Sequence, residues 1–153
     1  MAVSVLMVCL GNICRSPLAE AALRRHAAQN GLDVIVDSAG TGDWHIGHPP
    51  DPRAQDVALR LGGINISGLR GRQVKREDFQ RFDYILAMDG SNLRNLRELA
   101  GEDATAKFSM LLDYAPGQVG QPVPDPYYDD DEAFEHVWRL VESAAVGFAR
   151  AKL

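Results

Sequence analysis

The segment 3–17 constrains this chain most, because it passes from an apolar run into a helix through one short turn. The run at 3–8 predicts a buried strand, and Ser16-Pro17 predicts a helix start, since proline is favoured at the first helical position. Such a strand-to-helix turn leaves backbone N–H groups unpaired beside the positive end of the helix dipole. The turn at 9–15 is therefore expected to bind an anion.

Two side chains of this turn suggest a reaction with that anion. A cysteine beside a helix N-terminus and an arginine tends to ionise, so Cys9 is expected to be a nucleophilic thiolate. Arg15 offers a planar fork of donors that matches two oxygens of a phosphoryl group. The pair predicts hydrolysis of a phosphate ester through a cysteinyl-phosphate intermediate. Cys9 could instead be a small buried hydrophobe, but its place in this turn favours catalysis. The turn is not a nucleotide P-loop, since G-x-x-x-x-G-K-[ST] is absent.

Length, charge and hydropathy exclude several classes of protein. A chain of 153 residues suits a single domain over 1–153 with one sizeable core. The net charge of −5, without a basic stripe, argues against binding to nucleic acid. No apolar run approaches the roughly 18 residues of a membrane span, and the amino end lacks a signal-peptide layout. We therefore expect a cytoplasmic protein that does not associate with a membrane.

Both cysteines of the chain, Cys9 and Cys14, lie in the same turn. They cannot join distant parts of the fold by a disulfide, which favours a reducing compartment. Cys14 could form a reversible, redox-sensitive bond with Cys9, or it could simply pack at the base of the turn. The sequence favours neither reading over the other.

Strands and helices alternate along the chain. Strands are predicted at 3–8, 34–36 and 84–88, with a weaker one at 107–112; helices are predicted at 17–29, 51–61, 77–82, 91–100 and 131–152. The alternation predicts an α/β fold, a doubly wound four-stranded parallel sheet of order 2-1-3-4 with helices on both faces. Ligands of such sheets bind beyond the carboxyl ends of the strands. Cys9 and Asp89 follow the first and third strands and should both lie at that edge.

A leaving phenoxide or alkoxide needs a proton, and Asp125 is the best candidate to supply it. It lies between two prolines on the long 116–128 loop, which restricts the backbone around it. We expect Asp125 to donate a proton first and then to act as the base for the attacking water. Without the Cys9–Arg15 turn elsewhere in the chain, Asp125 would be interpreted as a turn residue or a helix cap. The acidic run at 129–132 offers further candidates, but it more simply complements the dipole of the last helix.

The motifs Cys9–Pro17 and Asp125-Pro-Tyr-Tyr128 together resemble the low-molecular-weight protein tyrosine phosphatases. The likeness covers nearly the whole chain, including 38–41, Arg72-Gln73, 83–89 and 91–93. It implies Cys9 as nucleophile, Arg15 as phosphate clamp and Asp125 as general acid. It further implies that Asn12 holds the loop in shape, Ser16 donates to the Cys9 sulfur and Asp89 positions Arg15. The rest of the phosphate-binding loop would be Leu10, Gly11, Ile13 and Cys14.

Aromatic side chains around this site would select the substrate. Trp44, Tyr127 and Tyr128 could flank a deep slot that suits a phenyl ring, with His45 beside them on the rim. The family likeness favours phosphotyrosine, so the expected partners are phosphotyrosine-containing proteins. Ile13 supports the same choice, because relatives that act on phosphoarginine carry Thr at this position. No metal or other cofactor is expected, because the sequence has no cluster with metal-ligand spacing. The protein is expected to be a monomer or a weak dimer.

This sequence departs from the family in one segment. Many relatives have a histidine in the part that matches 67–72, where it bonds to the Asn–Ser network beneath the loop, and this chain has none there. Its four histidines are His26 and His136, which are expected on solvated helix faces, and His45 and His48 in the rim loop.

Two rival functions share parts of this pattern. A thiol-dependent arsenate reductase has the same fold and loop, but it relays oxidation to further cysteines, and this chain has none outside the loop. A non-catalytic phosphotyrosine-binding module would be expected to lose Cys9 or Asp125, and both are present.

Overall fold

The core strand β1 (Val3–Cys9) lies at the centre of the computed structural model, which describes residues 2–153. Its side chains alternate between the two faces of the sheet, because successive residues of a strand point to opposite sides. Val5 and Met7 pack into one hydrophobic cluster, and Leu6 and Val8 pack into another. Both clusters are buried, which explains why the run carries no polar alternation.

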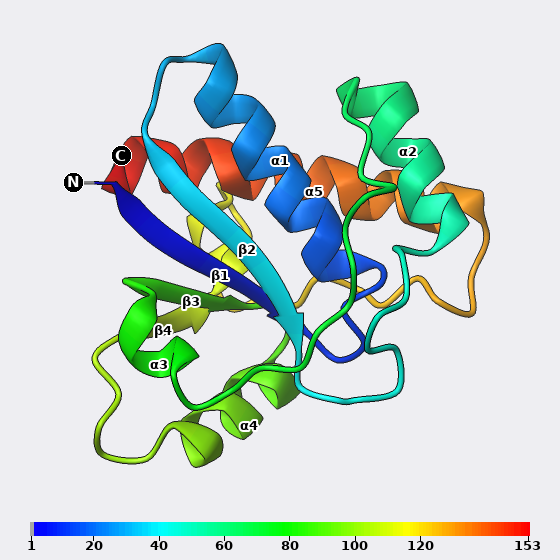
Figure 1. Ribbon diagram of the computed structural model, residues 1–153. Helices are drawn as coiled ribbons and strands as arrows, with labels where there is room; N and C mark the ends of the chain where they lie inside the picture. The colour runs from blue at the N-terminus through cyan, green and yellow to red at the C-terminus, as the bar shows by residue number, and fades with distance from the viewer. Residues whose placement is uncertain (1) are drawn as a thin grey trace.

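The sheet has four parallel strands in the order β2-β1-β3-β4, which confirms the predicted topology. The flanking strands are β2 (Val34–Gly40), β3 (Tyr84–Ala87) and β4 (Lys107–Met110). Helices cover both faces (Figure 1). On one face lie α1 (Arg15–Gln29), α2 (Pro52–Gly62) and α5 (Asp131–Lys152), and on the other lie α3 (Asp78–Arg81) and α4 (Gly90–Ala100).

The structure differs from the sequence prediction at several element ends. Strand β2 continues to Gly40 rather than ending at Val36, because residues 37–40 pair with the second half of β1 despite their polar character. Strand β4 ends at Met110, and a 3-10 turn, η1 (Leu111–Tyr114), replaces its predicted last residues. Helix α5 has the predicted bounds.

Helix α1 begins two residues earlier than predicted, at Arg15, so Pro17 occupies its third position rather than its first. Proline is tolerated there, because none of the first four amides of a helix has an intrahelical partner. The earlier start brings Arg15 into the first turn of the helix. Its guanidinium can therefore reach back across the carboxyl edge of the sheet.

No helix among residues 2–153 is both long enough and apolar enough to cross a membrane.

Candidate active site

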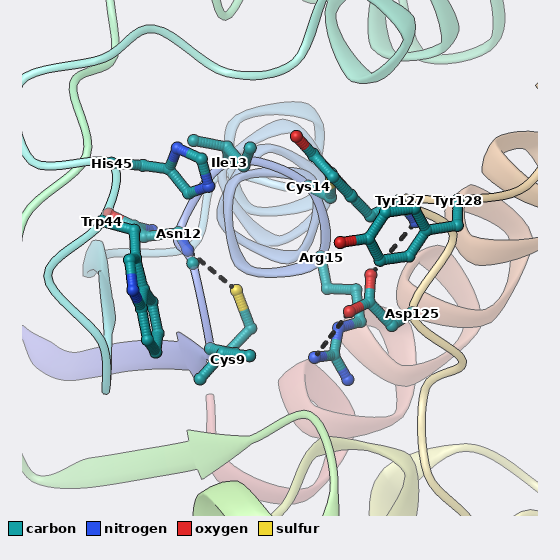
Figure 2. Close-up of a pocket in the computed structure, with 12 residues that line it drawn as sticks. Cys9, Asn12, Ile13, Cys14, Arg15, Trp44, His45, Asp125, Tyr127 and Tyr128 are labelled. Carbon is teal, nitrogen blue, oxygen red and sulfur yellow. Dashed lines mark hydrogen bonds and ion pairs between the residues drawn. The ribbon is translucent and has the colours of Figure 1, made fainter.

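The turn between β1 and α1, residues 9–16, forms a tight loop that we call the Cys-Arg loop. The amide of Asn12 donates to Cys9 Sγ at 3.2 Å, and Ser16 Oγ lies 3.0 Å from the same sulfur. Cys9 is only 2% exposed, yet it lines a cavity, with its sulfur inside the curve of the loop (Figure 2). The loop thus surrounds the sulfur with donors while leaving it open on one side.

The loop amides are arranged to receive an anion. Within residues 2–153, the backbone N–H groups of 10, 11, 13 and 14 donate no hydrogen bond. Helix α1 adds the positive end of its dipole, and no acidic side chain occupies its first turn.

Asn12 fixes the shape of the Cys-Arg loop. Its φ of 58° is in the left-handed region, which asparagine tolerates better than most residues. Its side-chain amide donates to Ser16 Oγ at 2.7 Å and to Ser38 Oγ at 3.0 Å. The side-chain carbonyl oxygen of Asn12 accepts a hydrogen bond from the backbone N–H of Arg72 at 3.0 Å. Gly40 also matters here, because a Cβ at that position would lie 2.7 Å from the Leu10 carbonyl oxygen.

The hydrogen-bond network beneath the loop ends on a buried carboxyl group rather than on a histidine. Ser38 Oγ donates to Glu20 Oε1 at 2.7 Å, and Glu20, 2% exposed, forms an ion pair with Arg24. Burial raises the pKa of Glu20 above its usual range, against the opposing effects of Ser38 and Arg24. Leu69, from the segment that lacks the family histidine, packs against the apolar core.

Arg15 is held from two sides and is almost fully buried. Its Nη1 donates to Asp89 Oδ2 at 2.8 Å and to the carbonyl oxygen of Val123 at 3.1 Å. Asp89 follows β3, so the predicted meeting of the first and third strand ends occurs. Asp89 also caps α4 by accepting from the Asn92 amide, which fixes its own position.

Asp125 lies beside Arg15 on a loop, residues 123–130, that we call the Asp125 loop. Its Oδ2 is 3.8 Å from Arg15 Nη2, and its Oδ1 accepts from the amide of Tyr127 at 3.1 Å. The carboxyl group is half exposed, at 49%, and borders the cavity. An acid from the far end of the sequence thus lies at the same opening as Cys9 and Arg15 (Figure 2).

The cavity has a volume of about 390 Å³ and gathers most of the residues proposed from the sequence. Trp44 and Tyr128 on its rim are 67% and 93% exposed, and the rings of Tyr127 and Tyr128 meet edge to face at 4.9 Å. Ser16 and Asp89 lie outside the lining and support it from behind. The cavity is lined by Cys9, Leu10, Gly11, Asn12, Ile13, Cys14, Arg15, Trp44, His45, Asp125, Tyr127 and Tyr128.

Cys14 precedes α1, and its thiol is buried while bordering the cavity. Burial, reinforced by the negative charge of Asp51, raises the pKa of Cys14 far above its usual range. Cys14 is therefore a neutral thiol at physiological pH. Both cysteines are free in this structure.

The remaining histidines and acids have local roles. His48 packs near His45, with ring centroids 5.6 Å apart, but does not line the cavity. Asp130 caps α5 by accepting from the Ala133 amide, and Asp131 and Glu132 occupy its first turn, which agrees with the helix-dipole interpretation. Within residues 2–153, no group of three or more His, Cys, Asp or Glu side chains is placed to hold a metal ion.

Sequence reasoning did not identify several supporting residues: Ser38, Glu20, Arg72, Val123 and Arg53. Ser38 carried a signal, since it belongs to the Ser-Ala-Gly-Thr segment that matches the family. The contribution of Val123 is a backbone carbonyl, which has no signature in sequence.

Comparisons with known proteins agree with this geometry. The sequence profile described as low molecular weight phosphotyrosine protein phosphatase matches residues 4–153. The low molecular weight protein-tyrosine-phosphatase YfkJ of Bacillus subtilis is 48% identical over 143 residues, which cover 92% of this chain and 90% of that protein.

Solved structures extend the likeness to the fold. The crystal structure of Primo-1 superposes with a TM-score of 0.93 at 38% identity, covering 99% of both chains. That of DARP, a Drosophila arginine phosphatase, gives a TM-score of 0.89 at 34% identity, covering 96% of both chains.

Proposed function

This chain belongs to the low molecular weight phosphotyrosine protein phosphatases, which are phosphoric monoester hydrolases, and from that premise we propose that it hydrolyses phosphotyrosine esters through a phosphorylated Cys9. The proposal rests on one observation, that a thiol, a guanidinium and a carboxyl group line the same cavity. Cys9, Arg15 and Asp125 all line it; Cys9 is buried, and the guanidinium of Arg15 and the carboxyl of Asp125 approach to 3.8 Å.

In the first step the Cys9 thiolate attacks phosphorus, and the P–O bond to the tyrosine oxygen breaks. The free loop amides and the fork of Arg15 hold the phosphoryl oxygens, where negative charge is greatest in the transition state. Asp125 transfers its proton to the leaving oxygen, so the phenol departs neutral.

In the second step Asp125, now a carboxylate, takes a proton from water, and that water attacks the phosphocysteine. The S–P bond breaks, which releases inorganic phosphate and returns the Cys9 thiolate. Ser16, 3.0 Å from the sulfur, is placed to donate a hydrogen bond as negative charge returns to it. Asn12 keeps Ser16 in position through its 2.7 Å bond.

A phosphoarginine substrate is the alternative, because the similar protein DARP is named an arginine phosphatase. Ile13 in the cavity lining argues against it, since the relatives that act on phosphoarginine have Thr at this position. The aromatic rim of Trp44, Tyr127 and Tyr128 favours a flat phenyl ring that reaches the deep sulfur. We therefore propose phosphotyrosine-containing proteins as the substrates.

The experiment is a hydrolysis assay with p-nitrophenyl phosphate in the presence of EDTA. We expect the native protein to be active and Cys9→Ser to be inactive. On a phosphotyrosine peptide, whose leaving phenol needs a proton, Asp125→Ala should lose about 10²–10⁴-fold in rate, the usual contribution of a general acid, while still trapping that peptide. Activity that survives Cys9→Ser would exclude the cysteinyl-phosphate route.

The same assay with peptides carrying phosphotyrosine, phosphoserine or phosphoarginine tests the substrate. The deep sulfur and aromatic rim predict the highest kcat/KM for phosphotyrosine. A preference for phosphoarginine would contradict the substrate choice argued from Ile13 and the aromatic rim. It would leave the proposed role of Cys9 as nucleophile unchanged.

A further inference from the structure

Arg53, near the start of α2, makes more hydrogen bonds at the border of the cavity than its surface position suggests. Its Nε and Nη2 each donate to the Asp51 carboxylate at 3.0 Å. Its Nη2 also donates to the carbonyl oxygen of Tyr127 at 2.8 Å, and its Nη1 donates to that of Asp129 at 2.9 Å. The guanidinium carbon lies 4.5 Å from the centre of the buried Phe134 ring. The side chain is 34% exposed, so most of it is committed to these contacts.

The stretch 124–130, which contains Asp125, has few other anchors. Most of its side chains are exposed, although Pro126 is buried. Its backbone bonds are local, such as the one from the Asp129 amide to the Pro126 carbonyl. Val123, at the start of the Asp125 loop, is anchored to Met88 and Arg15, and Asp130, at its end, accepts from the Ala133 amide. Among residues 2–153, Arg53 is the only residue whose side chain donates hydrogen bonds to 124–130 from outside that stretch.

Arg53 is linked to the Cys-Arg loop as well. The amide of Asp51 donates to the Ile13 carbonyl oxygen at 2.8 Å, and the carboxylate of Asp51 accepts the fork of Arg53. Burial favours a neutral Asp51, but hydrogen bonds from Arg53 outweigh it and hold the pKa of Asp51 below its usual range. The Asp51–Arg53 pair thus stays charged at neutral pH and bridges the two loops that form the site.

We propose that Arg53 is a positioning residue for the general acid, because its fork holds the Asp125 loop at the distance from Cys9 that leaving-group protonation requires. The inference rests on the proposed function of Asp125. Arginine suits the role because its rigid fork satisfies a carboxylate and two carbonyl oxygens together, which a lysine ammonium cannot do with fixed geometry.

The test uses aryl phosphates whose leaving groups differ in basicity. A poor leaving group such as phenol needs the proton of Asp125, whereas p-nitrophenol departs readily without it. We expect Arg53→Met to lower kcat/KM for phenyl phosphate about tenfold more than for p-nitrophenyl phosphate, as part of the 10²–10⁴-fold that a general acid supplies. Asp125→Asn should show the same selectivity more strongly, and adding Arg53→Met to it should change that selectivity no further.

Arg60→Met is the matched control. Arg60 lies on the same helix and joins α2 to α5 through Glu135 at 2.9 Å, and it forms no hydrogen bond or ion pair with residues 123–130. This variant should keep the native ratio between the two substrates. Arg53→Lys keeps the positive charge and removes the fork, so it should behave like Arg53→Met. Thermal unfolding of each variant confirms that the protein compared is folded.

The outcomes separate this inference from the proposed function. An equal loss on both substrates for Arg53→Met would mean that Arg53 acts through the Cys-Arg loop, and no loss would mean that it has no role; either result overturns the inference. If Asp125→Asn itself shows no dependence on the leaving group, the proposed role of Asp125 is the one that fails.

Discussion

The buried carboxyl of Glu20 ends the series of hydrogen bonds that starts at the sulfur of Cys9. Ser16, Asn12 and Ser38 lie between them, and each contact is 3.0 Å or shorter. In a buried network, a polar atom without a hydrogen-bond partner lowers the stability of the fold. Each side chain of the network therefore limits the orientations that its neighbours can adopt. The network therefore stabilises the strained φ of Asn12 that the loop requires.

The raised pKa of Glu20 predicts a pH dependence of stability. Between the ordinary value of 4.5 and the higher folded value, the folded protein binds more protons than the unfolded chain. The contribution of Glu20 is thus complete below pH 4.5 and is lost as pH rises through the folded pKa. Relative to Glu20→Gln, the native protein should lose free energy of unfolding with rising pH, by at most about 1.4 kcal/mol per pH unit.

Urea unfolding of both proteins between pH 4 and pH 8 measures this difference. Glu98→Gln, which removes an exposed carboxyl group outside this network, is the matched control. A difference that stays constant or grows with pH would contradict the assignment to Glu20.

At the scale of elements, close backbone approaches decide how α5 lies against the rest of the fold. Helix α5 packs on α1, α2 and η1 with a buried face that includes Phe134, Val137, Val141 and Phe148. Gly147 lets the Tyr114 carbonyl of η1 come so near that an added Cβ would overlap its oxygen. Since α5 follows the Asp125 loop directly, its position also sets where that loop ends.

Gly147→Ala should therefore destabilise the protein by about 1–3 kcal/mol, the usual cost of overpacking. This expected loss of stability already includes the better helix propensity of alanine, which stabilises the helix by about 1 kcal/mol. Ser143→Ala, at an exposed position of the same helix, should change stability by less than about 0.5 kcal/mol. Denaturant unfolding of the two variants gives both numbers, and a Gly147→Ala protein as stable as the native one would refute the close approach.

At the scale of the whole molecule, the sheet order brings four separate segments to one edge. Cys9 ends β1, Asp89 follows β3, Gly40 ends β2, and the Asp125 loop joins the same edge through the bond from the Val123 amide to the Met88 carbonyl. Ligands of doubly wound sheets bind there because the strand ends diverge and helix N-termini point at the opening. A protein with a net charge of −5 thus offers a local site for an anion.

Binding of inorganic phosphate, the proposed product, should stabilise the whole fold, because a ligand of the native state shifts the unfolding equilibrium. At 100 times its dissociation constant, phosphate should add about 2.7 kcal/mol, and each kcal/mol raises the Tm of a chain of this size by about 2–4 °C. Thermal scans at matched ionic strength, with chloride as the reference salt, measure the shift. Arg15→Met should lose it, and an equal shift in that variant would place phosphate elsewhere.

The order of the strands and the place of the proposed nucleophile and phosphate clamp could be predicted from the sequence, because their signals are local. An apolar run, a cysteine, a turn and a Ser-Pro pair are adjacent in the chain, and right-handed crossovers leave few topologies for alternating strands and helices. Periodicity over 22 residues likewise gave the bounds of α5. The ends of β2 and β4 were harder, because pairing with a neighbouring strand overrides local propensity there.

Only the tertiary structure decided what supports the site. Arg72 reaches Asn12 from 60 residues away, Arg53 reaches Tyr127 from 74, and Val123 reaches Arg15 from 108. Each of these contacts uses a backbone N–H or carbonyl group. Nearly every residue has both groups, so the type of residue does not reveal which residue makes such a contact. Sequence by itself was enough to propose the reacting groups because their chemistry depends on residue type, whereas their support depends on distances that exist only after the chain has folded.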